Sequence, residues 1–354
     1  MASCQHRAAP ERRRALRALR GHPINAEPVV IAKGPTIGKA GIAWNGEVYM
    51  IAWDEGQSGL SPVSILARRI SPDGTFVDDR PIGVMPGHAP DVESLGEDFL
   101  IGCSRYAQSP QFIDAWQRRI SGRTGQFLDA APVLNGTGYN SNVRVRTDGT
   151  SWIMLYQSNW SHNAANVDAR MSFIDRNGVQ TPANNPTPFS GITGTPDIAF
   201  SGAPGGDGKY LIVWRDHTLS NADNSISGRI MNADRTFATG AFTIAQAPGR
   251  QLSPVVGWDG STFIVVWEDQ RHQHAFFDQR TDIYAARVTT TGLVLDPNGI
   301  PVVRGANAAA SPSVFSSKGM SLVASARFSI TPPFDTYRIG LTRLWNGSLK
   351  ATAP

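Results

Sequence analysis

The chain has 354 residues, of which 41% are hydrophobic and 18% charged, so it can build a packed core. Its formal net charge is +4, and six arginines within the first 21 residues carry much of that excess, which leaves the body near neutral and argues against a nucleic-acid footprint. No apolar stretch is long enough to span a membrane as a helix, and the N-terminus shows no secretory apolar segment.

The chain opens with residues 1–26, which we predict to be a basic tail. There are two cysteines, Cys4 in this tail and Cys103 far from it. A native disulfide is therefore not expected, and Cys103 is interpreted as a buried free thiol. The composition gives no sign of a cofactor.

From residue 27 to residue 347 one pattern recurs: a β-branched strand, a tight turn, a second strand, a polar loop and a third strand that carries Arg. The turns are dipeptides such as Asn45-Gly46 and Asp259-Gly260, which are typical of β-hairpins. The residues that end the second strand recur every 50 to 58 positions, a spacing that fits a four-stranded blade. These residues are Trp53, Cys103, Tyr156, Trp214, Trp267 and Ser325.

The first strand of each copy contributes one position to an unbroken β-branched column, which indicates half-buried strands that pack on a neighbouring blade. The column is Ile42, Val92, Val145, Ile198, Val256 and Val314. We therefore predict an all-β fold, a six-bladed β-propeller of four-stranded antiparallel blades. The blades are expected near residues 38–84, 89–134, 140–189, 195–245, 252–303 and 311–347.

The sixth copy has no clear fourth strand before residue 347. Residues 27–33, which include Pro28-Val29-Val30, are similar to the fourth strand Ile300-Pro-Val-Val303 of the fifth copy. We predict that this N-terminal segment docks as the outer strand of the last blade and closes the propeller. Residues 348–354 are then a C-terminal tail.

Two motifs in the fifth copy are Trp267-Glu-Asp-Gln-Arg271 and Asp282-Ile-Tyr-Ala-Ala-Arg-Val288. The repeats in this way resemble those of bacterial six-bladed β-propeller repeat proteins. That resemblance implies the fold and an exported location, extracellular or periplasmic. Asp-box motifs and the signatures of WD40 repeats are absent, which disfavours those two families.

In such a propeller the loops between second and third strands share one face with the connections between blades, and ligand sites gather there. Polar and aromatic side chains that bind sugars or transfer protons are concentrated in these loops. They are Arg105, Tyr106, Trp160, His162, Arg215, Asp216, His217, Asp269, Arg271 and His272.

Several interpretations of these loops stay open. Trp160 or Tyr106 would stack on a sugar while polar neighbours bind its hydroxyls or a carboxylate. His217 or His272 with Tyr106 would be the base and acid of a uronate lyase, and an arginine would neutralise the substrate carboxylate. A metal site would draw on His217, His272, His274 and Asp216 or Asp269, but His272-Gln-His274 is a weak spacing signal, and we expect no metal. The plainest alternative is solvated loops in which Asp269 and Arg271 pair within one blade.

A second candidate lies along the channel, which we call the bore. Asp91, Arg144 and Asp197 come just before the β-branched column in consecutive blades and point the opposite way. They are expected to form an acid–base–acid cluster that anchors a ligand or balances charge, with Glu93 and Arg146 one pleat deeper. Arg144 between the two carboxylates argues against calcium.

We predict a ligand-binding propeller whose loop face recognises a carbohydrate or another polar ligand. The first alternative is a polysaccharide-degrading enzyme similar to uronate lyases. The second is a scaffold that binds protein partners in a larger surface assembly.

Overall fold

Antiparallel strand pairing organises the whole described part of the chain. The computed structural model describes residues 30–32, 37–56, 63–106, 113–158, 168–181, 193–217, 224–272, 281–305, 309–329, 336–345 and 348–352. Every regular element in these residues is a β-strand. Grouped by sheet, the strands are β1 (Ile37–Trp44), β2 (Tyr49–Glu55), β3 (Ser64–Ile70) and β4 (Ile82–Pro86); β5 (His88–Leu95), β6 (Asp98–Tyr106), β7 (Ile113–Ile120) and β8 (Val133–Gly136); β9 (Asn140–Thr147), β10 (Trp152–Ser158) and β11 (Asp168–Ile174); β12 (Thr193–Phe200), β13 (Lys209–His217), β14 (Asn224–Asn232) and β15 (Phe242–Ala245); β16 (Gln251–Trp258), β17 (Phe263–Asp269), β18 (Asp282–Val288) and β19 (Ile300–Val303); β20 (Ala309–Ser317), β21 (Met320–Ser329), β22 (Thr336–Trp345) and β23 (Ser348–Thr352).

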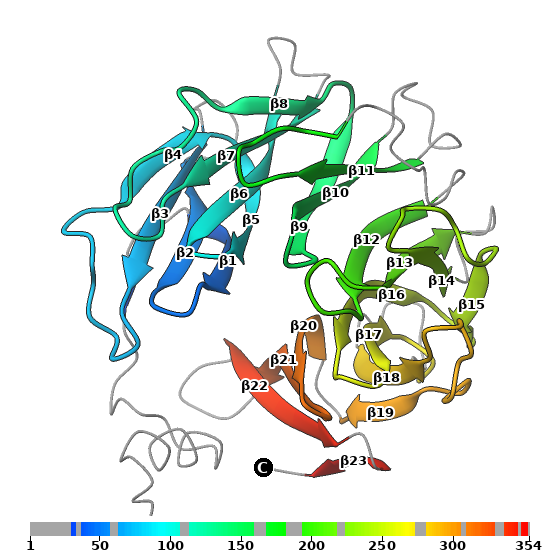
Figure 1. Ribbon diagram of the computed structural model, residues 1–354. Helices are drawn as coiled ribbons and strands as arrows, with labels where there is room; N and C mark the ends of the chain where they lie inside the picture. Colours follow the sequence, from blue (N-terminus) through cyan, green and yellow to red (C-terminus); the bar gives the residue numbers. More distant parts are fainter. Residues whose placement is uncertain are drawn as a thin grey trace, which may run out of the picture. The chain divides into compact units, whose positions relative to one another are not determined.

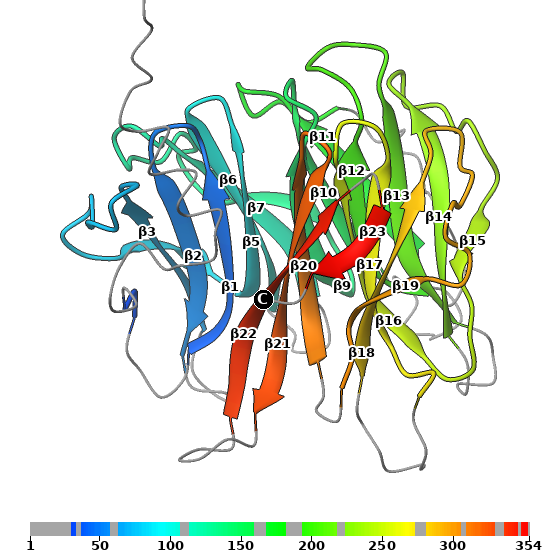
Figure 2. The same ribbon diagram turned by 90° about the horizontal axis from the view of Figure 1, so that it is seen from below.

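The six sheets correspond in order to the six predicted blades. Each runs outward from an innermost strand, and consecutive innermost strands contact one another from β1 through β5, β9, β12 and β16 to β20 (Figure 1). Seen after a 90° turn, the strands run between the same two ends of the sheets (Figure 2). In the third sheet three strands are described, and the predicted fourth falls on residues 182–192, outside the described residues.

The hydrophobic core lies between sheets. Five clusters of buried apolar side chains join the first sheet to the second, the second to the third, and so on to the sixth. The strand-end column from Trp53 to Ser325 is buried in all six copies, as the repeat predicts. Four members of the β-branched column, those from Val92 to Val256, are buried as well. The alternation in the sequence thus encodes sheet-on-sheet packing.

The two ends of the sheet series lack such a cluster among the described residues. Ile42 of β1 is 62% exposed, although its equivalents in the next four sheets are buried. On the sixth sheet, Ile339 is 73% exposed, whereas its equivalent Ile65, also four residues before the third-strand Arg, is fully buried against the second sheet. We call these two exposed apolar surfaces the seam, which comprises Ile42, Trp44, Phe315, Ile339 and Leu341.

The closing strand differs from the prediction. The fourth strand of the sixth sheet is β23, which pairs antiparallel with β22 through Arg343 and Thr352. The fourth position of this sheet, which the sequence assigned to residues 27–33, is therefore taken by Ser348–Thr352. Of that N-terminal segment, residues 30–32 are described and have no regular structure.

The third-strand arginines are structural. Arg69 forms an ion pair with Asp78 at 2.6 Å and donates to the carbonyl oxygens of Gly122 and Arg123 in the next sheet, at 3.0 and 2.7 Å. Arg119 repeats the pattern with Asp129. A fixed guanidinium fork satisfies several acceptors at once, so these arginines tie a sheet to its neighbour. They are not available to a ligand.

Candidate functional site

The strand register confirms that two sets of connections share one end of the sheets. Glu55 at the end of β2 pairs with Ser64 at the start of β3, and β4 ends at Pro86, just before β5 begins at His88. The same order holds in the later sheets. We call this end the loop face. The residues at the strand ends of this face are fixed in position because their backbones are paired with the neighbouring strand.

In the second sheet, Tyr106 ends β6 and is exposed, as a stacking residue requires. Its ring meets that of His88 edge-on at a centroid distance of 5.0 Å. Burial lowers the pKa of His88, so this imidazole is mostly neutral at pH 7. Arg105 lies over the ring of Trp116 at 4.9 Å. Tyr106 and His88 lie on one face of the sheet, and Arg105 and Trp116 lie on the other, so these are two separate contacts near the loop face.

The third and fourth sheets give a partial picture. Trp160, His162 and His274 lie outside the described residues. His217 is the last residue of β13 and pairs with Asn224 through the backbone, and its side chain is likewise outside the described part. The metal set of His217, His272 and His274 that the sequence offered therefore falls partly outside the described residues.

Two further predicted residues of the fourth sheet have partners or neighbours. Asp216 accepts a hydrogen bond from the hydroxyl of Ser227 at 3.0 Å. Arg215 lies over Gly194, where an added Cβ would come within 2.7 Å of the guanidinium. Burial lowers the pKa of Arg215, and the charge of Arg250 lowers it further. This arginine therefore stands partly desolvated beside a like charge.

Asp269 and Arg271 of the fifth sheet pair with each other, which was the plainest alternative for this loop. Arg271 donates to both carboxylate oxygens at 2.8 and 2.7 Å, and to the carbonyl of Asn298 at 2.7 Å. Its guanidinium lies over the ring of Tyr284 at 4.1 Å. The indole of Trp267 donates to the same carboxylate at 2.8 Å. Every strong contact here is internal to the blade, so the pair shapes the loop.

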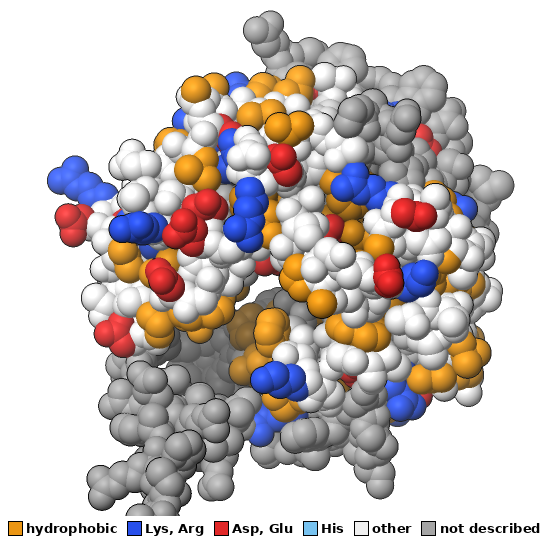
Figure 3. All heavy atoms as spheres, viewed as in Figure 1, with side chains coloured by type: hydrophobic (Ala, Val, Ile, Leu, Met, Phe, Trp, Pro, Cys, Tyr) orange, Lys and Arg blue, Asp and Glu red, His pale blue; other side chains and the backbone are white. Residues whose placement is uncertain are grey.

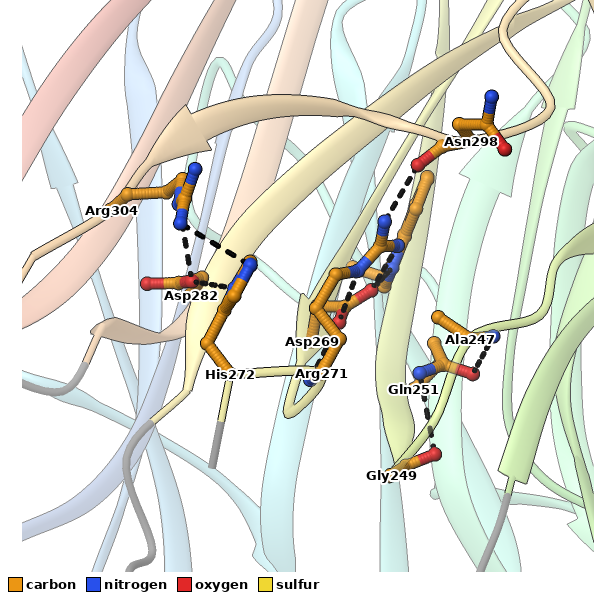
Figure 4. A network of polar contacts seen from close by, with 10 residues as sticks. Ala247, Gly249, Gln251, Asp269, Arg271, His272, Asp282, Asn298 and Arg304 are labelled. Atoms are coloured by element: carbon orange, nitrogen blue, oxygen red, sulfur yellow. Dashed lines mark hydrogen bonds and ion pairs between the residues drawn. The ribbon is translucent and has the colours of Figure 1, made fainter. Parts of the chain in front are cut away.

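His272 is held in a separate cluster. Its Nδ1 lies 3.0 Å from Asp282 Oδ2, and Nε2 lies 3.2 Å from Arg304 Nη2 (Figure 4). Arg304 was missed by sequence reasoning. The signal was present, because Arg304 follows the fourth strand and therefore belongs to the loop face. No group of three or more His, Cys, Asp or Glu side chains in the described residues is arranged to hold a metal ion.

The bore contains the strongest charge cluster, but its central base is Arg146. Arg146 contacts Asp91 at 2.9 Å and Asp197 at 2.8 Å, and so joins the second, third and fourth sheets. Asp91 also accepts the backbone N–H of Val145, and Asp197 that of Val256, both at 3.1 Å. The prediction that Arg144 lies between the two carboxylates is wrong. Arg146, one pleat deeper, has the reach to bridge them.

A recurring backbone feature aims these side chains. Each innermost strand from β5 onward has a register shift with one residue at positive φ, such as Ala89 at 51° and Thr195 at 46°. Asp91 and Asp197 each follow two positions later. An extra residue of this kind bends a strand and redirects the side chains beside it. A positive φ is unfavourable for these non-glycine residues, and it persists because the paired strands on either side hold the backbone in place.

Glu93 lies on the same side of β5 as Asp91, two residues further along. Its removal from bulk water raises its pKa to about 7, although Arg146 opposes this shift. The pKa of Asp91 is instead lowered, because Arg146, Arg144 and Lys39 together outweigh burial. The pKa of Lys39 is itself lowered to about 8, chiefly by desolvation and then by the charge of Arg144. The bore thus places a protonated carboxyl beside an ionised one near neutral pH.

The face of the molecule seen in Figure 3 shows no segregation of acidic from basic side chains. Acidic and basic side chains are interspersed over the sheets, and a hollow opens near the middle, where the innermost strands meet (Figure 3). No helix among the described residues has the length and apolar character to cross a bilayer.

Comparisons with known proteins show the fold. The chain is similar to the structure of a GH93 α-L-arabinofuranosidase from Fusarium graminearum in complex with arabinobiose, with a TM-score of 0.56 and 14% identity over 87% of this chain and 93% of that one. A Penicillium chrysogenum α-L-arabinanase complexed with arabinobiose gives 0.55 and 12% over 89% and 95%. A neuraminidase-like protein from A/bat/Guatemala/164/2009 gives 0.55 and 9% over 88% and 89%.

No family model matches the chain, and no curated protein matches its sequence. The resemblance to bacterial repeat proteins therefore stays a prediction. What the structural likeness establishes is an all-β arrangement of propeller type.

Proposed function

We propose that the chain is a carbohydrate-processing enzyme of β-propeller fold that cleaves a glycosidic bond at its bore. The observation that carries the proposal is the carboxyl pair on β5. Glu93 has a pKa of about 7, whereas that of Asp91 lies below its ordinary value. Two carboxyl groups whose environments separate their pKa values are the mark of an acid and an ionised partner.

The spacing suits this chemistry. Residues two apart on a strand are separated by about 7 Å along its axis. Glycosidases hold their two carboxyl groups roughly 5 to 9.5 Å apart. Glu93 donates its proton to the leaving glycosidic oxygen as the C–O bond breaks. Water supplies the hydroxyl to the anomeric carbon, and its remaining proton returns Glu93 to the acid form. Asp91 stays ionised through Arg146 and stabilises the positive charge that develops on the sugar.

The solved structures support a carbohydrate substrate, since two of the similar folds are arabinan-acting enzymes bound to arabinobiose. A polymer substrate also agrees with the extracellular or periplasmic location that the repeat motifs imply. The lyase assignment of His272 and Tyr106 is weaker, because Asp282 and Arg304 already engage His272. The competing hypothesis is the one that the sequence analysis put first, a propeller that binds a carbohydrate without cleaving it.

The test is turnover on a panel of arabinan, xylan and polygalacturonate, with reducing ends and ultraviolet absorbance followed together. New reducing ends without absorbance near the unsaturated-uronate band support hydrolysis. Glu93→Gln should remove turnover, while Glu97→Gln, on an exposed turn two residues after β5 ends, should keep it. Absorbance from unsaturated uronate would assign the chain to the lyases, and retention on a polymer without product would assign it to binding proteins.

We also propose that the sheets close into a six-bladed propeller by direct packing across the seam. The apolar equivalents of Ile42, Ile339 and Leu341 are buried between neighbouring sheets, except Val314, the equivalent of Ile42 in the sixth sheet, which is partly buried. Burying one such side chain contributes about 1.5–3 kcal/mol, so the three together offer on the order of 5 kcal/mol. Closure needs no strand from residues 27–33, because β23 already completes the sixth sheet.

A further inference from the structure

Three polar side chains from three connections meet at the loop face of the fifth sheet. His272 follows β17, Asp282 begins β18, and Arg304 follows β19. Figure 4 shows them grouped together, apart from the Asp269–Arg271 pair of the same sheet. Because paired strand ends hold all three, their mutual positions are fixed by the sheet.

The fifth sheet has two acid–arginine pairs, Asp269–Arg271 and Asp282–Arg304. They differ in how many N–H groups of the arginine bond to the carboxylate. Asp269 and Asp282 lie directly opposite each other in the register, so each needs its own cation. Arg271 meets Asp269 with two short bonds and is only 18% exposed. Arg304 approaches Asp282 through Nε alone at 3.6 Å, and it is 52% exposed. Its guanidinium therefore balances the charge of Asp282 without being consumed by it.

His272 complements this open guanidinium. Arg304 can only donate, so the 3.2 Å contact makes His272 Nε2 an acceptor and leaves the ring proton on Nδ1, where it is donated to Asp282. The imidazole is stacked on Tyr284 and is 41% exposed. Nε2 thus points to the same solvent-facing edge as Arg304, in an orientation fixed by a largely buried carboxylate.

We infer that His272 and Arg304 form a binding site for the carboxylate of an acidic sugar residue, which deepens the proposed function and rests on it. The ligand replaces the contact between the two side chains. Arg304 donates to one carboxylate oxygen, and protonated His272 donates its Nε2–H to the other. Asp282 keeps the Nδ1 proton, so the added proton balances the charge of the ligand.

The charged groups around the imidazole fit this exchange. Asp282 and Arg304 contact it directly, and the ring of Tyr284 stacks on it. Arg271, which pairs with Asp269, lies over that same tyrosine ring. Arg271 and Asp269 neutralise each other. An incoming carboxylate therefore meets two N–H donors, while the neighbouring Asp269–Arg271 pair is already balanced.

The experiment is calorimetric titration with trigalacturonate in a Glu93→Gln background, which prevents turnover. At pH 5.5, Arg304→Gln should weaken binding roughly 10- to 100-fold, the value of a charge-assisted contact. The matched control is Arg123→Gln, which should bind as the parent does. Arg123 is exposed in the turn between β7 and β8 of the second sheet, at the end away from the loop face. His272→Gln should weaken binding as well, because the charged donor beside Arg304 is lost.

Other probes separate the sources of the anion. The methyl ester of trigalacturonate lacks the charge and should bind at least tenfold more weakly. Inorganic phosphate binding as tightly as trigalacturonate would overturn the assignment to acidic sugars, as would an Arg304→Gln variant that binds normally and keeps its unfolding midpoint. Arabinan hydrolysis by Arg304→Gln reports on the bore separately, so retained hydrolysis with unchanged trigalacturonate binding refutes this inference alone.

Discussion

Replacing Arg146 by methionine tests the cross-link that holds the bore together. The side chain bridges Asp91 and Asp197, which come from the sheets on either side. Asp197 is only 1% exposed, so the substitution leaves a buried carboxylate without its cation. Breaking a buried pair by removing one partner costs about 3–5 kcal/mol, and water in the bore reduces this figure because Arg146 is 27% exposed. We expect a loss of about 3 kcal/mol in the free energy of unfolding.

Urea denaturation followed by tryptophan fluorescence measures that loss. Arg144→Met is the matched control, since Arg144 lies two residues away on β9 and is not the residue that pairs with the carboxylates. Its substitution removes a charge that lowers the pKa of Asp91 but leaves both ion pairs in place, so it should cost clearly less than Arg146→Met. An Arg146→Met variant as stable as the control would refute the bridging account.

The ion pair between Asp91 and Arg146 also predicts how the free energy of unfolding depends on pH. The folded-state pKa of Asp91 is lowered, so its stabilisation is present above the unfolded value of about 4 and is lost as the pH falls through the folded value. The difference between wild type and Arg146→Met should therefore be largest at pH 7 and shrink toward pH 3. A difference that grows in acid would contradict this sign.

Three further predictions concern packing. Burial raises the pKa of Cys103 to about 12, so a Cys4→Ser variant should show no thiol reactive toward Ellman's reagent until it is unfolded; rapid native labelling would contradict that burial. With both native cysteines replaced, Ile42→Cys and Leu341→Cys should form a disulfide that raises the melting temperature if the seam closes, and absence of the cross-link in oxidising buffer would argue for an open seam. Truncation after Trp345 removes β23 and should lower the melting temperature by several degrees, whereas an unchanged value would mean that β23 contributes nothing to the sixth sheet.

The sequence predicted the sheets well because strand alternation is a local signal. The column from Val92 to Val256 needed only a period of two, and the buried strand ends followed from the same register. The turn of the last copy carries no Asn-Gly or Asp-Gly dipeptide. The two-residue loop is Lys318-Gly319, with φ of 51° and 75°, and the left-handed lysine gives no compositional hint.

The site was less accessible to sequence reasoning because its contacts cross between sheets. Asp91 and Asp197 were identified as bore residues, but their partner depends on side-chain reach, which favoured Arg146 over Arg144. Arg304 was missed because the sequence reasoning looked for site residues in the loops between second and third strands, whereas Arg304 follows the fourth strand. The closing strand failed for a similar reason: residues 348–352 carry little apolar pattern, whereas residues 27–33 resemble a genuine fourth strand.

The pH profile of polysaccharide cleavage by wild type and Glu93→Gln tests the central claim most directly. If Glu93 is the proton donor, the wild-type rate should fall as the pH rises through about 7, since the acid must be protonated to act. Glu93→Gln should lose at least a hundredfold in rate, the typical value of general acid catalysis, while it keeps its affinity for the polymer. Cleavage by Glu93→Gln at the wild-type rate, with the same pH profile, would contradict the account.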